Sequence, residues 1–206
     1  MSRSIKAVLP PKRSNGKTTI IFDDGSVLKL IPAVAADQGL YPGMELEAAD
    51  LERLKAANGA ASARQRAVRI ISAAGVSKRD LEERLTRKGE DPRDAKNAVQ
   101  WLSDLDLLDD AETARQIVAR GVNRGYGAER IRQMLYEKRI PRQYWDEALD
   151  QMPDMSDALT DFLQKRLGEA PDEKQRRSAL NAALRRGYTW QEVRSAMERI
   201  SRGIEE

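Results

Sequence analysis

The chain has 206 residues, with 36 Lys and Arg side chains against 33 Asp and Glu, and it contains neither His nor Cys. The two absences exclude Cys and His nucleophiles, His general bases, Cys/His zinc sites and disulfides. A net charge of +3 is too small to indicate nucleic-acid binding unless the basic residues are clustered. No apolar run approaches the roughly 20 residues of a membrane span, and we expect a cytoplasmic protein.

The N-terminal segment combines basic residues with strand-forming ones. We expect residues 1–16 to be a flexible basic arm, because they contain basic residues, no acidic residue and the pair Pro10-Pro11. Two β-branched and apolar runs follow, at 18–22 and 26–31, on either side of Asp23-Asp24-Gly25. An Asp-Gly step supplies the positive φ of a tight turn, so these runs predict a β-hairpin.

Helices are expected from the hairpin onward. A helical turn is predicted over 33–39, and a longer helix from Ala48 to Asn58 that Gly59 closes. With the hairpin, they form a small extension over 17–60. Beyond it, apolar residues recur only at helical spacing, which predicts helices throughout the rest of the chain.

One pattern of apolar residues and a helix end occurs three times. Two apolar residues four positions apart precede a base and a residue at the expected helix terminus. The copies are Leu81-Leu85-Lys88-Gly89, Ile131-Leu135-Lys138-Arg139 and Ala179-Ala183-Arg186-Gly187. Their last residues lie 139 − 89 = 50 and 187 − 139 = 48 positions apart, which leaves room for three short helices. We predict a mainly α fold of tandem three-helix repeats over 61–108, 109–152 and 154–203.

A group of aspartates at the start of the second repeat admits two interpretations. Asp104, Asp106, Asp109 and Asp110 could form a divalent-metal loop, but the glycine and glutamate of an EF-hand are missing. Asp109 instead has the spacing of a capping box with Glu112, and we favour helix capping. We predict no metal site and no cofactor.

A second motif imitates a nucleotide site. Gly16-Lys17-Thr18 matches the end of a P-loop, but Pro11 occupies the position of the first glycine. The motif also precedes a strand instead of following one, so backbone amides could not cradle a phosphate, and we treat the match as chance. No carboxylate stands in an apolar context that would shift its pKa, and we predict no catalytic residue.

Basic residues gather in the middle repeat. Between positions 115 and 142 there are eight basic residues and only two acidic ones, Glu129 and Glu137. This excess of positive charge suits binding to a polyanion or to an acidic protein groove, and a solvated helix face explains it equally well. Gly125-Tyr126-Gly127 places an aromatic before a helix N-terminus, which suits an anionic contact, and a simple turn explains it almost as well. The candidate binding residues are Arg115, Arg124, Tyr126, Arg130, Arg132, Lys138 and Arg139.

Four segments, in combination and order, resemble the RecX family, the bacterial regulators of the RecA recombinase. They are SKRDLEERLTRKG at 77–89, LLDD at 107–110, GYGAERIRQML at 125–135 and LRRGY at 184–188. The likeness covers about 61–203, whereas 1–60 match only loosely. The resemblance implies a nine-helix curved solenoid in the groove of the RecA–single-stranded DNA filament. There it would restrain ATP hydrolysis and strand exchange and favour filament disassembly, in DNA repair and the SOS response.

The resemblance also implies a protein without enzymatic activity, and we expect the free protein to be a monomer. Two alternatives stay open from the residues alone. One is a direct DNA-binding protein, such as a transcriptional repressor, that uses Arg-rich helices in a groove. The other is an enzyme that uses only carboxylate, Lys, Ser or Tyr side chains.

The chain departs from the family pattern at the ends of two helices and in one core. The family usually has glycine where this chain has Asp106 and Arg139. An arginine in a left-handed cap costs about 1–2 kcal/mol, so we expect the helix before Arg139 to end differently. Ala179 and Ala183 replace a pair of large apolar residues, and we expect Leu180 and Leu184 to take over their packing.

Overall fold

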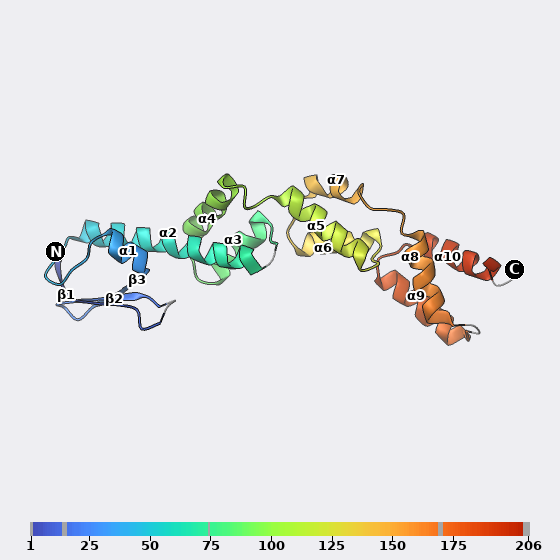
Figure 1. Cartoon of the computed structure of the whole chain (residues 1–206), viewed down its shortest axis with the longest axis horizontal. Coiled ribbons are helices and arrows are strands. Elements are labelled where there is room, and N and C mark those ends of the chain that lie inside the picture. Colours follow the sequence, from blue (N-terminus) through green and yellow to red (C-terminus); the bar gives the residue numbers. More distant parts are fainter. Residues whose placement is uncertain (1, 14–15, 74, 169–170, 204–206) are drawn as a thin grey trace. The chain divides into compact units, whose positions relative to one another are not determined.

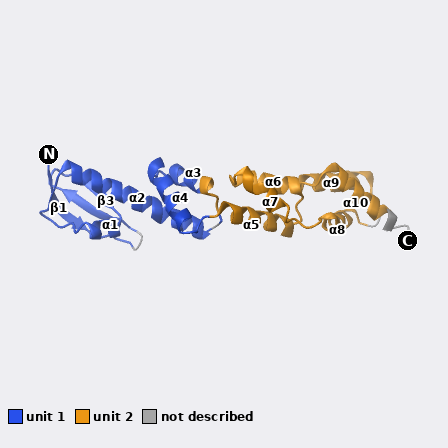
Figure 2. Cartoon of the chain, turned by 90° about the horizontal axis from the view of Figure 1, so that it is seen from above, with its two compact units in different colours: residues 1–75, 81–108 blue, residues 76–80, 109–206 orange. Residues whose placement is uncertain are grey.

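The structure is a computed structural model that describes residues 2–13, 16–73, 75–168 and 171–203. Within these ranges the chain forms ten α-helices, one 3₁₀ helix and four β-strands (Figure 1). The residues group into two compact units (Figure 2), the first made of 1–75 with 81–108 and the second of 76–80 with 109–206. The predicted mainly α fold with a small N-terminal β element is confirmed.

The first unit begins with a four-stranded antiparallel sheet in the order β3-β2-β1-β4. Its strands are β1 (Arg3–Leu9), β2 (Thr18–Phe22), β3 (Val27–Leu30) and β4 (Glu45–Leu46). The predicted hairpin is formed by β2 and β3, in which Ile21 pairs with Val27. Gly25 has a φ of +81° in the turn, which is the conformation for which an Asp-Gly step was expected.

The prediction of a flexible arm over 1–16 is wrong, as is the restriction of strands to the hairpin. Residues 3–9 form β1, which pairs with β2 through Ile5 opposite Phe22 and Leu9 opposite Thr19. A bulge between Ile5 and Ala7 breaks the strict alternation of apolar and polar residues that marks a strand in a sequence. Only Ile5 of this strand is fully buried, so the basic composition concealed the strand.

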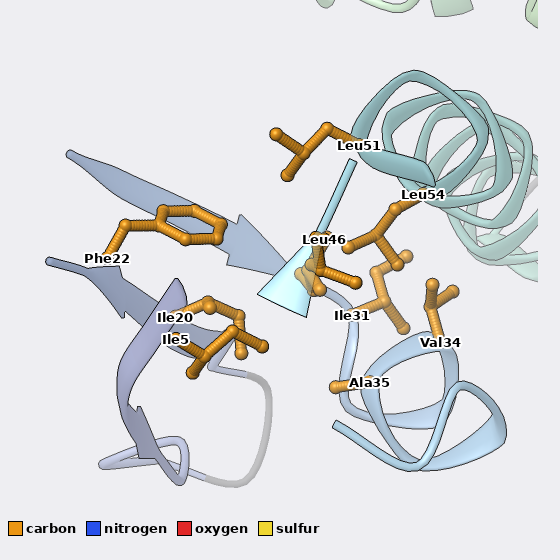
Figure 3. Packing of buried hydrophobic residues seen from close by; sticks show 10 residues of the cluster. Ile5, Ile20, Phe22, Ile31, Val34, Ala35, Leu46, Leu51 and Leu54 are labelled. Atoms are coloured by element: carbon orange, nitrogen blue, oxygen red, sulfur yellow. The ribbon is translucent and has the colours of Figure 1, made fainter. Parts of the chain in front are cut away.

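The sheet is covered by two helices, α1 (Pro32–Asp37) and α2 (Ala48–Ala73). Figure 3 shows how their apolar side chains meet those of the strands. Ile5, Ile20 and Phe22 from the sheet are at most 2% exposed, and Leu54 from α2 is 3% exposed in the same cluster. The N-terminal segment therefore has a hydrophobic core of its own.

The predicted helix end at Gly59 is wrong, because α2 continues to Ala73 as one helix of 26 residues. The proposed boundary between residues 60 and 61 therefore lies inside a helix. A Cβ atom at position 59 would collide with the Asp94 carboxylate. Only this carboxylate, the end of a flexible side chain, lies near the glycine, so the packing of α2 on α4 carries the helix past Gly59 despite the cost of glycine in a helix interior.

Two shorter helices complete the first repeat, α3 (Lys78–Arg87) and α4 (Pro92–Asp104). α2 packs on α4. The side chain of Asp91 accepts a hydrogen bond from the Arg93 amide and Pro92 occupies the first helical position, where both residue types are favoured.

The remaining helices belong to the second unit. The middle repeat contains α5 (Asp110–Asn123), α6 (Ala128–Glu137), the 3₁₀ helix η1 (Arg142–Tyr144) and α7 (Trp145–Leu149). The third contains α8 (Ser156–Leu167), α9 (Glu173–Arg185) and α10 (Trp190–Gly203). No described residue after Leu46 lies in a strand. The apolar pairs of the threefold pattern, on α3, α6 and α9, are all at most 1% exposed.

Among the described helices, six end with the same two hydrogen bonds, at Gly39, Gly89, Asp106, Gly125, Arg139 and Gly187. At Arg139, the Ile140 amide donates to the Leu135 carbonyl and the Arg139 amide to the Tyr136 carbonyl. This is the Schellman arrangement, with a left-handed residue after the cap. Arg139 adopts it with a φ of +58°, so the expectation that this helix ends differently is wrong.

The third repeat packs around its two alanines in a way that the sequence predicts only in part. Leu180 is partly buried against this core, but Leu184 is 37% exposed and does not take over the packing. Leu159 and Leu163 of α8 and the ring of Tyr188 fill the space instead. These side chains come from elements that the local spacing of α9 could not reveal.

Candidate functional site

The candidate basic residues of the middle repeat lie on α5 and α6 and at the ends of these helices. Arg124 is the C-cap of α5 and Lys138 is the C-cap of α6. Arg124, Arg132 and Arg139 are exposed, whereas the other candidates, Arg115, Tyr126, Arg130 and Lys138, are half-buried. The candidates therefore do not form one stripe along a single helix.

Several of these bases already have carboxylate partners. Arg115 lies 3.0 Å from Glu112 and 3.5 Å from Glu147, and Arg130 lies 3.4 Å from Glu137. Arg132 pairs with Glu129 in the same way. Ion pairs at this exposure are worth about 0–1 kcal/mol, so a polyanion could displace the carboxylates at little cost. No carboxylate among the described residues pairs with Arg124 or Lys138.

The Gly125-Tyr126-Gly127 loop forms a joint between the middle and third repeats. The Gly127 amide donates to the Arg186 carbonyl at 2.9 Å, and the Glu129 amide to the Gly187 carbonyl at 3.2 Å. The C-terminal end of α9 thus meets the N-terminal end of α6, an alignment that the helix dipoles favour. These two amides are occupied within the protein, so the anionic contact predicted at this loop, which stays a prediction, would need other donors.

Two side chains of the third repeat reinforce this joint. Arg186 Nη1 donates to the Arg124 carbonyl at 3.3 Å, and the Tyr188 hydroxyl donates to the Gly125 carbonyl at 3.2 Å. The Arg186 guanidinium also lies 4.1 Å from the centre of the Phe162 ring, a cation–π distance. Arg186 and Tyr188 were not among the predicted site residues. Both belong to the LRRGY segment, and Arg186 is also the base of the third copy of the repeated pattern.

Tyr126 is half-buried. Its ring packs partly against the core cluster of the middle repeat, which includes Ile131 and Leu135. This contact holds the loop in position.

Backbone atoms meet directly at the joint because both sides lack a side chain. A Cβ atom at Gly127 would collide with the Gly187 backbone, and one at Gly187 would collide with Arg130. Gly187 also has a φ of +87°. Arg124 and Arg130 consequently flank the Arg186-Gly187 segment, which gathers three arginines at one end of α6.

Lys138 and Arg139 lie at the opposite end of α6, where the first turn of α3 is bound. Ser77 Oγ donates to the Lys138 carbonyl at 2.7 Å and accepts from the Asp80 amide. The Lys78 amide donates to Asp110 Oδ1 at 2.9 Å. Burial raises the pKa of Asp110, which the hydrogen bond from the Lys78 amide partly opposes. Asp110 is thus a cap for α3.

The favoured capping role of the aspartates agrees with the structure in part. Asp109 accepts hydrogen bonds from the amides of Ala111 and Glu112. The Glu112 carboxylate accepts hydrogen bonds from Arg115 and Gln116 and not from the Asp109 amide, so only one of the two hydrogen bonds of the predicted capping box is formed. In the part of the chain that the structure describes, no three acidic side chains converge as metal ligands, and no helix is both long and apolar enough to cross a bilayer.

Comparison with known proteins identifies the relatives of this chain. Residues 109–149 match the family model for the second three-helix domain of RecX. Regulatory protein RecX of Chromohalobacter salexigens is 32% identical over 141 residues, which are 66% of this chain and 91% of that protein. The RecX of Halorhodospira halophila is 33% identical over 150 residues, which are 67% of this chain and 89% of the relative.

The solved structures agree in fold. A crystal structure of regulatory protein RecX superposes with a TM-score of 0.64 at 19% identity, covering 95% of this chain and 99% of the other. RecX from Lactobacillus salivarius gives a TM-score of 0.59 at 18% identity, over 70% of this chain and 98% of its own. The identity to the curated relatives, over nine-tenths of their length, establishes the family. This chain is a member of the RecX family of regulatory proteins.

Proposed function

We propose that this protein binds the RecA–single-stranded DNA filament in its groove and inhibits ATP hydrolysis and strand exchange, which favours filament disassembly. Membership of the RecX regulatory family carries the proposal, together with the resemblance of the quoted segments to regulators of RecA. The protein acts by occupying space in the filament and performs no chemistry of its own. We place it in the cytoplasm, as a monomer before it binds.

The basic residues of the middle repeat are the proposed contact surface. Arg124 and Arg130 flank the joint with the third repeat, Arg115 and Arg132 lie on α5 and α6, and Lys138 and Arg139 lie at the other end of α6. A polyanionic groove would exchange its counterions for these side chains. Tyr126 contributes by fixing the loop that carries Arg124, through its contact with the core.

Titration of RecA with this protein during ATP hydrolysis on single-stranded DNA tests the proposal. We expect ATPase activity to fall as the protein is added. Activity should stay at its starting level when the protein is omitted, and it should recover when fresh RecA is supplied. Unchanged hydrolysis at saturating protein would overturn the proposal. Tight binding of one duplex sequence without RecA would instead indicate a repressor, and ATP turnover by the pure protein would indicate an enzyme.

A further inference from the structure

The first unit contains a basic pocket where β2, α1 and α2 meet. It has a volume of about 350 Å³, and its polar lining includes Lys17, Ser62, Gln65, Arg66 and Arg69. We propose that this pocket binds a backbone phosphate of single-stranded nucleic acid. The site lies outside the middle repeat and is independent of the contact surface proposed above.

Arg66 is held in place by a buried acid. Its Nε donates to Glu90 Oε1 at 2.6 Å, and Ser62 Oγ donates to the same oxygen at 3.1 Å. The Glu90 side chain is only 8% exposed, whereas that of Arg66 is 40% exposed. A guanidinium has five N–H donors in a fixed fork, so anchoring through Nε leaves the two Nη nitrogens for a ligand.

The other two bases of the pocket have no such partner. Within the described ranges, neither Lys17 nor Arg69 forms an ion pair with an acid. Three bases and Glu90 give the pocket a charge of 3 − 1 = +2. A phosphate group that accepts charge-assisted hydrogen bonds would neutralise part of this charge.

The bases at the start of α2 behave differently. Arg53 pairs with Asp50, and Lys55 lies 2.8 Å from Glu52. Lys55 and Glu52 line a second pocket, whose other charged residues are Asp23, Asp24, Glu45 and Arg3. Acids therefore gather at the pocket beside the β2–β3 turn and unpaired bases at the pocket beside Lys17. This separation would direct a polyanion to the basic pocket and away from the acidic one.

The chemistry of the lining selects a phosphate and not a base. The apolar part consists of Ile31, Pro32 and Ala33, so no aromatic ring is available for base stacking. The charged donors of the lining are side chains. The Ile31 amide already binds Asn58 Oδ1 at 2.8 Å, the Gly16 amide binds the Arg13 carbonyl at 2.8 Å, and Pro32 has no amide hydrogen. Lys17 thus contributes a side chain to the pocket without the backbone cradle of a P-loop. Contacts of this kind bind nucleic acid without sequence preference.

Binding of fluorescein-labelled oligothymidylate to the full chain, followed by fluorescence anisotropy at several salt concentrations, tests the site without RecA. The variant carries Lys17→Ala and Arg69→Ala, and the matched control carries Arg53→Ala and Lys55→Ala, which removes the same charge from the paired bases. We expect the variant to bind about tenfold more weakly at low salt. The slope of log K against log salt should become shallower by about 0.7, because one phosphate is no longer neutralised. The control should bind nearly as the parent does.

The site is overturned if the parent does not bind the oligonucleotide, or if variant and control are weakened equally. Vesicles of phosphatidylglycerol and phosphatidylcholine provide a second arm. Stronger binding to these vesicles than to the oligonucleotide, abolished in the Lys17→Ala/Arg69→Ala variant, would assign the pocket to a lipid headgroup and also overturn it. Circular dichroism should show unchanged folding of both variants. Because RecA is absent, failure here leaves the ATPase titration unaffected.

Discussion

Each end of α6 contacts the end of a helix from a neighbouring repeat, and the two contacts are built differently. At its N-terminal end Gly127 faces Gly187, and main-chain amides bind main-chain carbonyls directly. At its C-terminal end the corresponding positions are Ser77 and Arg139. There the Ser77 side chain binds the Lys138 carbonyl at the end of α6, and Asp110 of α5 binds the Lys78 amide of α3. The same helix-to-helix contact therefore depends on the absence of Cβ atoms at one joint and on two specific side chains at the other.

The middle repeat has an arginine, Arg139, at a position where the other two repeats have glycine. Gly89, Arg139 and Gly187 occupy equivalent places and all have a positive φ. Glycine is required for close approach only at Gly187, because a Cβ atom at Gly89 would meet no neighbour within 4 Å. A non-glycine residue is therefore tolerated at a left-handed position where no backbone lies opposite.

The largest effect is expected from Gly187→Ala. The added methyl group would meet the Arg130 backbone, in addition to the strain of a left-handed alanine, so the free energy of unfolding should fall by roughly 3 kcal/mol or more. Gly89→Ala is the matched control, because its φ of +88° carries the strain without the collision, and about 1 kcal/mol is expected. Urea unfolding measures both. Equal losses would show that the close approach at Gly187 is unimportant.

Asp110→Ala should have the next largest effect at the other joint. Loss of the cap for the Lys78 amide should cost about 1–2 kcal/mol. Asp110→Asn keeps an oxygen acceptor and removes a buried charge, so it should be nearly neutral at pH 7. A loss in the asparagine variant as large as in the alanine variant would contradict a role limited to hydrogen bonding.

The same residue predicts a pH dependence. Because burial raises the pKa of Asp110 above its unfolded value, the folded state binds a proton more readily than the unfolded state. The stability contribution is fully present below the unfolded pKa and declines as pH rises through the folded pKa. Subtracting the pH profile of Asp110→Asn from that of the parent should reveal this decline. A difference that rises with pH would have the wrong sign.

Tyr188→Phe should weaken the first joint moderately. The ring stays in the core of the third repeat, but the hydrogen bond to the Gly125 carbonyl is removed, at a cost of about 1 kcal/mol. Amide hydrogen exchange at Gly127 and Glu129 should accelerate, since their bonds cross the joint. Unchanged exchange at these two amides would show that the Tyr188 hydroxyl does not stabilise the joint.

The smallest effect, and a favourable one, is expected from Arg139→Gly. Glycine removes the strain of the left-handed arginine and should raise the free energy of unfolding by about 0.5–1 kcal/mol. Arg132→Gly, in the interior of α6, should lower it by about 1 kcal/mol. Thermal melting distinguishes the two, and destabilisation by Arg139→Gly would show that the arginine side chain contributes more than its backbone costs.

The sequence was most informative where local chemistry decides the structure. Helical spacing and the helix ends of the repeated pattern located α3 and α6, and Asp23-Asp24-Gly25 located the hairpin. β1 was missed because a bulge disrupts its alternation, and a helix end was wrongly placed at Gly59 because α2 packs on α4, which is distant in sequence. The joint was missed for the same reason. Arg186 and Tyr188 bind the loop around Gly125, which lies more than sixty residues earlier in the sequence, and residue spacing within one helix cannot predict such a contact.

The contribution of the middle repeat to inhibition is tested most directly by reversing charge at the joint. Arg124→Glu with Arg130→Glu should weaken inhibition of the RecA ATPase tenfold or more, about 1.4 kcal/mol, while helical content and melting temperature stay nearly unchanged. The control is Arg176→Glu with Arg177→Glu, two exposed arginines in the first half of α9. It makes the same change in charge and should inhibit as the parent does. Inhibition by the Arg124/Arg130 variant equal to that by the parent would contradict the account and leave these bases as a solvated surface.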